Sequence, residues 1–146
     1  MTARFFADTN IAVYTLDANP ARRRAALSVM KTRPVISVQV VNEFLNVALG
    51  KMRLPRQTAG RLAAILLRRC EVVDLTVGMV RTAITLGERY RISHWDALII
   101  SAALAAACDK LYSEDLQDGQ VFEGRLTVCN PFAPGVGAAV IDPTER

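Results

Sequence analysis

Short apolar runs alternate along the chain with longer stretches in which apolar residues recur at helical spacing. The apolar runs predict buried β-strands over residues 3–8, 34–38, 71–75, 110–113 and 125–131. The longer stretches predict helices over residues 20–32, 38–52, 55–70 and 76–92, and one more that opens at Ser93 and continues through the apolar run 97–108. A turn is expected where Thr9 and Asn10 follow the first strand. This alternation indicates an α/β fold, a three-layer α/β/α domain with a mainly parallel central sheet.

The spacing of apolar residues also predicts which side of each helix is buried. The expected buried positions are Ala25, Leu27, Val29 and Met30 in the helix over 20–32, Val41, Phe44, Leu45 and Ala48 in the helix over 38–52, and Val80, Ala83, Ile84 and Gly87 in the helix over 76–92. The run 97–108, interrupted only by Ser101, predicts a core helix. Ser37 and Ser93 are placed as helix caps, and Asp96 follows Ser93 at capping-box spacing.

Length and composition fit one globular domain. The chain has 146 residues, of which 51% are hydrophobic and 22% charged, and this length suffices for a single core. We expect the domain over residues 1–132 and a loosely ordered extension over 133–146. The longest apolar run is shorter than the roughly 20 residues of a membrane helix, and the N-terminus does not resemble a signal peptide. The expectation is a cytoplasmic protein with no membrane association, and Cys70, Cys108 and Cys129 are expected to be reduced thiols.

Charge is distributed unevenly along the chain. Residues 18–70 carry eleven Lys and Arg against the single acid Glu43, whereas residues 109–118 carry four acids against one base. A basic region beside a short acidic segment is typical of a protein that binds a negatively charged partner and processes it at a site that holds cations. Arginine-rich solvated helix faces explain any one of these residues equally well.

The acids follow the predicted strands. Ligands of an open parallel sheet bind beyond the carboxyl ends of its strands, and Asp8 and Asp115 follow strands while Glu43 and Asp96 lie early in helices. If the strands are neighbours, these four carboxylates converge. Their mutual repulsion is relieved either by shared protons or by a hard cation such as Mg²⁺ or Mn²⁺. A metal site beside a basic surface suits phosphodiester hydrolysis, and the single His94 argues against a mechanism that uses paired histidines.

The same segments resemble the PIN-domain ribonucleases, and within them the VapC toxins of bacterial toxin–antitoxin pairs. The resemblance covers roughly residues 4–131 and rests on "FADTN" with Asp8, "VVNEF" with Glu43, "HWDALI" with Asp96 and "LYSEDLQDG" with Asp115, in that order. Each fragment is short, and their order and spacing make the combination specific. Glu114 is the competing acid beside Asp115, which the resemblance favours.

The resemblance implies an acidic quartet of Asp8, Glu43, Asp96 and Asp115 that holds Mg²⁺ or Mn²⁺. Thr9 and Asn10 would shape the pocket, Ser113 would supply a hydroxyl where the family often has Thr, and Asp118 would line the rim. It further implies an endoribonuclease toxin that leaves a 5′-phosphate, a homodimer, and a small VapB-like antitoxin. The antitoxin segment would bury apolar residues along the toxin.

Other interpretations stay open at this stage. The chief alternative is a nuclease-dead PIN domain that binds RNA or protein. A receiver domain requires an adjacent pair of acids after its first strand, and here Thr9 follows Asp8. A dehalogenase-type phosphatase requires Asp at the position of Asn10. Both classes are therefore disfavoured. Arg22, Arg23 and Arg24 are candidates for contact with RNA or antitoxin, or form a solvated helix start. Trp95 is a packing residue or a platform on which a base stacks.

Overall fold

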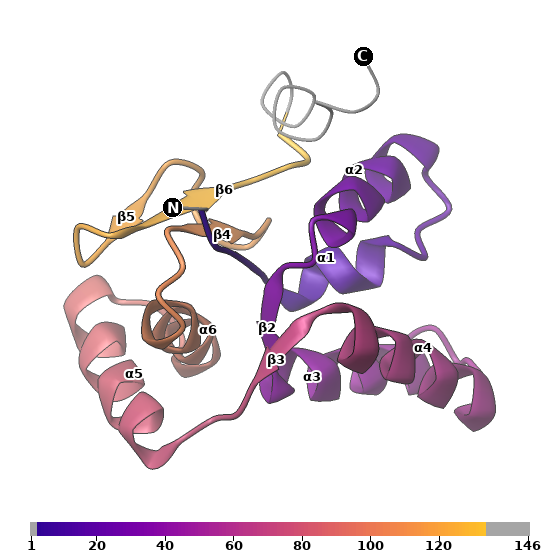
Figure 1. Cartoon of the computed structure of the whole chain (residues 1–146), viewed down its shortest axis with the longest axis horizontal. Helices are drawn as coiled ribbons and strands as arrows, with labels where there is room; N and C mark the ends of the chain where they lie inside the picture. Colours follow the sequence, from indigo (N-terminus) through magenta and orange to yellow (C-terminus); the bar gives the residue numbers. More distant parts are fainter. Residues whose placement is uncertain (1–2, 134–146) are drawn as a thin grey trace.

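The chain folds into alternating strands and helices, described for residues 3–133 by a computed structural model (Figure 1). The strands are β1 (Phe5–Ala7), β2 (Val35–Ser37), β3 (Glu71–Val73), β4 (Lys110–Tyr112), β5 (Val121–Phe122) and β6 (Leu126–Cys129). The helices are α1 (Thr9–Tyr14), α2 (Pro20–Lys31), α3 (Val38–Leu49), α4 (Arg56–Arg69), α5 (Val77–Tyr90) and α6 (His94–Ala105). The predicted extension over 133–146 lies, apart from Ala133, outside the described residues.

The strands form one mostly parallel sheet in the order β3-β2-β1-β4-β6-β5. Phe6 in β1 pairs with Val35 on one side and Leu111 on the other, and both ladders are parallel. Only the short edge strand β5 runs antiparallel, against β6. The predicted fold class, an α/β domain with a mainly parallel sheet, is confirmed.

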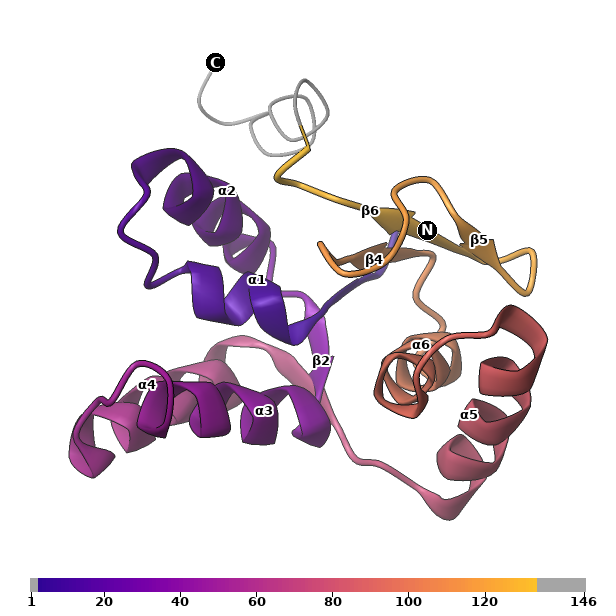
Figure 2. The ribbon, with the colours of Figure 1, turned by 180° about the vertical axis from the view of Figure 1, so that it is seen from behind.

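The order of the strands explains the three layers. From β1 to β3 the chain moves outward along the sheet, and it then returns past β1 to β4. Because crossovers between parallel strands are right-handed, reversing the direction of travel moves the connecting helices to the opposite face. Accordingly, α5 and α6 pack together on one side, whereas α1 to α4 gather on the other (Figures 1 and 2). Open parallel sheets bind ligands beyond the carboxyl ends of their strands at such a reversal, which here lies between β1 and β4.

The centre of the molecule is apolar and closed. Phe6, Ile36, Leu111 and Val128 come from four different strands and are at most 1% exposed. Every residue of α6 from Ala97 to Leu104 is buried, as a helix apolar all round requires. The predicted core helix is therefore confirmed. Because α6 is packed on all sides, the position of its first turn is fixed.

Two local predictions are wrong. The expected turn after β1 is the helix α1, because Asp8 caps it by accepting a hydrogen bond from the Thr9 amide and because Ile11 and Ala12 are buried. Six residues are too few for a helical period to show in the sequence. The edge strand β5 is also absent from the predicted elements, since two residues carry no alternation.

The predicted buried face of α3 is right for Val41, Phe44 and Ala48, with Leu45 half-buried against the core, whereas the predictions for α2 and α5 are partly wrong. In α5 the buried residues are Ala83 and Leu86, whereas Val80 and Ile84 are 37% and 54% exposed. In α2 the buried residues are Ala25, Ala26 and Val29, and Leu27 is 42% exposed. Both helices carry two overlapping apolar stripes, so that spacing alone does not choose between them.

One of the two predicted helix caps forms, and the cysteines are free. Ser93 caps α6 as predicted, since its hydroxyl accepts a hydrogen bond from the Asp96 amide at 3.1 Å. Ser37 occupies the N-cap of α3 but makes no side-chain cap bond, and its buried hydroxyl has no partner among the described residues. The three cysteines are free thiols, and two are buried. No helix of residues 3–133 is long and apolar enough to cross a membrane.

Candidate active site

The candidate site lies at the carboxyl ends of β1 and β4, where the strand order reverses direction. Asp8 directly follows β1, Ser113 to Asp115 directly follow β4, and Asp96 lies in the first turn of α6. The β1–β4 ladder pairs Ala7 with Tyr112, so the residues that follow these two strands emerge side by side. Residues separated by about a hundred positions in the chain therefore share one site.

Three of the four predicted acids meet there. One carboxylate oxygen from each of Asp8, Asp96 and Asp115 lies within 4.8 Å of the other two. Asp8 is buried, Asp96 is half-buried and Asp115 is exposed, so the three acids extend from the interior of the protein to its surface. All three donors are carboxylate oxygens.

Asp8 is the innermost acid and the most perturbed. Burial raises the pKa of its carboxyl to about 7, the charges of Asp115 and Asp96 add to the rise, and hydrogen bonds from Ser113 and Thr9 oppose it. The pKa of Asp96 is also raised, first by burial and then by Asp115 and Glu43. The site thus concentrates negative charge where it is poorly solvated.

Hydrogen bonds fix the orientation of these carboxylates. Ser113 donates to the second oxygen of Asp8 at 2.7 Å and accepts from the Asp115 amide at 3.1 Å. The Asn10 amide nitrogen donates to Asp115 at 3.2 Å, and its oxygen accepts from the Glu114 amide at 3.3 Å. The predicted supporting residues Asn10 and Ser113 therefore contact the acids directly.

Glu43 stands at the edge of the acidic group. One of its oxygens accepts a hydrogen bond from the Thr9 hydroxyl, and the other accepts from the Gln39 amide at 3.1 Å. Glu43 is not one of the three acids whose oxygens gather within 4.8 Å. Its charge still contributes to the raised pKa of Asp96. The hydrogen bond from the Thr9 hydroxyl links Glu43 on α3 to the residue that follows Asp8.

The acidic group suits a hard divalent cation. Mg²⁺ and Mn²⁺ prefer carboxylate oxygens, and they keep several waters when few protein ligands reach them. Burial first, and then repulsion between the acids, raises the pKa values of Asp8 and Asp96, and a cation would offset both effects. Asp8, Asp96 and Asp115 are the residues that would hold it, whereas Glu43 would act from the rim.

A family model described as the PIN domain matches residues 5–117. This chain belongs to the PIN domain family. The match spans Asp8, Glu43, Asp96 and Asp115, and the predicted family is thereby confirmed. No curated protein sequence matches the chain.

Solved structures share the PIN fold of this chain. A toxin–antitoxin complex from Klebsiella pneumoniae superposes with a TM-score of 0.66 at 19% identity, covering 90% of this chain and 98% of that chain. VapC20 of Mycobacterium tuberculosis, a sarcin–ricin loop cleaving toxin, has a TM-score of 0.62 at 19% identity, covering 94% and 96%. DNA-bound VapBC from Salmonella typhimurium has a TM-score of 0.64 at 19% identity, covering 87% and 98%.

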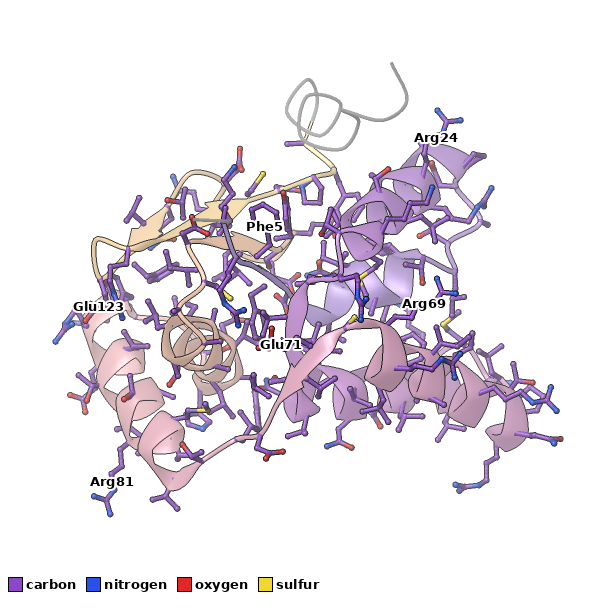
Figure 3. All side chains as sticks on the ribbon, viewed as in Figure 1. Phe5, Arg24, Arg69, Glu71, Arg81 and Glu123 are labelled. Atoms are coloured by element: carbon purple, nitrogen blue, oxygen red, sulfur yellow. The ribbon has the colours of Figure 1, made fainter. Side chains whose placement is uncertain are left out.

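Asp118 and the arginines of α2 lie outside the acidic group of this PIN domain. Asp118 accepts a hydrogen bond from the Asn130 amide at 2.8 Å and so ties two loops together. Arg22 pairs with Asp17 at 3.4 Å and covers the Tyr14 ring, and Arg23 donates to the Asp17 carbonyl. Arg24 is exposed at the outer end of the molecule, far from Glu123 in Figure 3.

Two features of the site were not predicted. Tyr14 donates a hydrogen bond to Glu114, which couples α1 to the acidic turn. Gln39, Asn42, Glu43 and Asn46 form a polar row along α3 and line a pocket next to the acids. The spacing i, i+3, i+4, i+7 of these four residues is visible in the sequence and marks them as one helix face.

Proposed function

We propose that this PIN domain is an Mg²⁺- or Mn²⁺-dependent endoribonuclease that acts in the cytoplasm as the toxin of a toxin–antitoxin pair. The observation that carries the proposal is the convergence of Asp8, Asp96 and Asp115, with oxygens within 4.8 Å, at the carboxyl ends of β1 and β4 in a PIN fold. The similar solved structures include VapBC complexes and a VapC toxin that cleaves the sarcin–ricin loop, which supports the choice of RNA as substrate.

The chain's own residues would position the reaction. Asp8, Asp96 and Asp115 would hold a divalent cation, and the chemistry that it would supply there is activation of a water for attack on phosphorus and stabilisation of charge on the leaving oxygen. Asp8, held by Ser113 and the Thr9 amide, would hold the ion from the buried side, and Asp115, held by Asn10, would hold it from the exposed side. Glu43 presents a carboxylate from α3 at the same edge. The products would carry a 5′-phosphate.

Cleavage of a labelled single-stranded RNA by the purified chain tests this proposal. We expect cleavage with Mg²⁺ or Mn²⁺, none with chelator, and a loss of at least a hundredfold in Asp96→Asn. Asp74→Asn is the matched control, because Asp74 is an exposed acid in the loop after β3. Cleavage that persists in both Asp8→Asn and Asp96→Asn would refute the metal site. Absence of cleavage with every divalent ion would favour the nuclease-dead binding module.

An apolar groove supports an antitoxin partner. A cavity of about 240 Å³ opens between α2, α3, α4 and the turn after α1, and its lining includes Leu16, Leu27, Met30, Phe44, Leu62 and Ile65. Leu27 and Ile65 are 42% and 40% exposed, and Lys31 and Arg69 add positive charge to the lining. This chemistry suits an amphipathic segment of a VapB-like antitoxin with apolar and acidic side chains.

A homodimer is the expected assembly of the toxin. Val77, Val80 and Ile84 lie three and four residues apart on α5 and are 70%, 37% and 54% exposed. An apolar row of this kind on a helix surface is typical of a protein–protein contact. We assign it to contact with a second copy of this chain.

A further inference from the structure

A second pocket adjoins the acidic group on the side of α3. Its volume is about 430 Å³, within the usual range for small-ligand pockets. It is lined by Gln39, Asn42, Glu43 and Asn46 from α3, Leu75 from the loop after β3, and Trp95 and Leu98 from α6. Glu43 belongs both to this pocket and to the edge of the acidic group.

The walls of the pocket are held in place by Gln39. Its amide nitrogen donates to Glu43 at 3.1 Å and to the Trp95 carbonyl at 3.2 Å, so that it ties α3 to the first turn of α6. Gln39 is 6% exposed, and its amide oxygen is buried without a partner among the described residues. An unpaired buried acceptor favours a ligand that brings an N–H donor.

The lining selects a flat, neutral and polar ligand. Trp95 is 62% exposed and offers an aromatic surface, while Leu75 and Leu98 supply apolar contact. The side-chain amides of Asn42 and Asn46 make no hydrogen bond within residues 3–133, and amides both donate and accept. Glu43 is the one charged residue in the lining, which disfavours a phosphate or an acidic peptide in this pocket.

We infer that this pocket binds one unpaired nucleobase of the RNA substrate, stacked on Trp95 and hydrogen-bonded at its edge by Asn42 and Asn46. Proteins read single-stranded RNA by splaying a base onto an aromatic side chain and bonding its edge to polar groups. The inference rests on the proposed ribonuclease function. Since Glu43 joins the pocket to the acids, the bound base would fix which phosphodiester lies at Asp8, Asp96 and Asp115.

Fluorescence provides a test that is independent of cleavage. Trp95 is the only tryptophan of the chain, so its emission reports on this pocket alone. The experiment titrates the Asp8→Asn variant, in the presence of Mg²⁺, with four single-stranded hexaribonucleotides. Each hexaribonucleotide contains a different single base in an otherwise abasic strand. Emission should be quenched saturably, with an affinity that differs at least tenfold between the best and the worst base. Asn46→Ala in the same background should weaken the best complex about tenfold, whereas Gln57→Ala, an exposed amide on α4, should not.

Cleavage by the otherwise native chain provides the second measurement. Trp95→Ala should raise KM about tenfold with little change in kcat, because stacking contributes to binding of the ground state, and Trp95→Phe should restore most of the loss. Asn42→Ala and Asn46→Ala should flatten the distribution of cleavage sites. The inference is overturned if no base quenches Trp95, or if these variants cut the same sites at the native rate. Native cleavage without quenching refutes the pocket alone, whereas quenching without cleavage refutes the ribonuclease function alone.

Discussion

Ser113 donates its hydroxyl hydrogen to the buried carboxylate of Asp8 at 2.7 Å and so joins the ends of β1 and β4 at the point where the sheet reverses. The same oxygen accepts from the Asp115 amide. One side chain, 0% exposed, thereby sets the positions of two of the three gathered acids.

Replacing Ser113 by Ala should destabilise the metal-free protein by about 1–3 kcal/mol at pH 8, because a charged buried acceptor and the Asp115 amide both lose their partner. Urea denaturation measures the change. The loss should be smaller in an Asp8→Asn background, where the acceptor carries no charge, and Ser113→Thr should keep most of the stability. Equal losses in the two backgrounds would show that Ser113 acts through packing and not through Asp8.

The stability of the metal-free protein should depend on Asp8 with a definite sign. The pKa of Asp8 rises from about 3.8 to about 7 on folding, so the folded state binds the proton more tightly. Proton binding at Asp8 therefore stabilises the folded state, on the order of a few kcal/mol. This stabilisation is complete below about pH 4 and is lost as the pH rises towards 7. Thermal unfolding in chelator at pH 5 and pH 8 measures it. In Asp8→Asn most of this decline should disappear, the remainder coming from Asp96, whose pKa is also raised by burial, and the variant should exceed the native protein in stability at pH 8.

Divalent cations should reverse that loss. At about a hundredfold excess over Kd a ligand of the folded state adds about 2.7 kcal/mol, which corresponds to roughly 5–10 °C in Tm for a domain of this size. Mn²⁺ should produce this shift at pH 8 and a smaller one at pH 5.5, where protons compete for Asp8. Asp96→Asn should abolish most of the shift and Asp74→Asn should keep it. An equal shift in Asp96→Asn would place the ion elsewhere.

The site could be predicted where a residue's position follows from the order of strands and helices. Asp8, Asp96 and Asp115 stand directly after strands or in the first turn of a helix, so the fold alone brings them together. Glu43 lies further along α3, and its distance from the other acids depends on the tilt of that helix and on the Thr9 hydroxyl. Neither is encoded in local spacing.

Helix faces show the same limit. Ile84 and Leu86 in α5 both belong to stripes of correct period, and packing against α6 decides that Leu86 is buried. Leu27 in α2 is similar, since it fits the apolar spacing and yet lines an open groove. A partner that covers such residues restores the burial that their hydrophobicity indicates.

The exposed row on α5 leads to a prediction about assembly. Ile84→Glu should convert a dimer to a monomer, because it places a charge in the middle of an apolar contact. Light scattering after size-exclusion chromatography measures the mass. Thr85→Glu, an exposed change on another face of the same helix, is the control for added negative charge. A native protein that is monomeric at every concentration would contradict the assignment of this row.

The apolar groove leads to the last prediction, which concerns the antitoxin. Ile65→Asp should weaken copurification with a co-expressed VapB-like antitoxin by at least tenfold, because Ile65 lines the groove between α2 and α4. Leu67→Asp is the matched control, since Leu67 lies on the same helix, is 53% exposed and does not line the groove. RNA cleavage should be unchanged in both variants, because neither residue contacts the acidic group. Equal binding of the native protein and Ile65→Asp would exclude the groove as the antitoxin site.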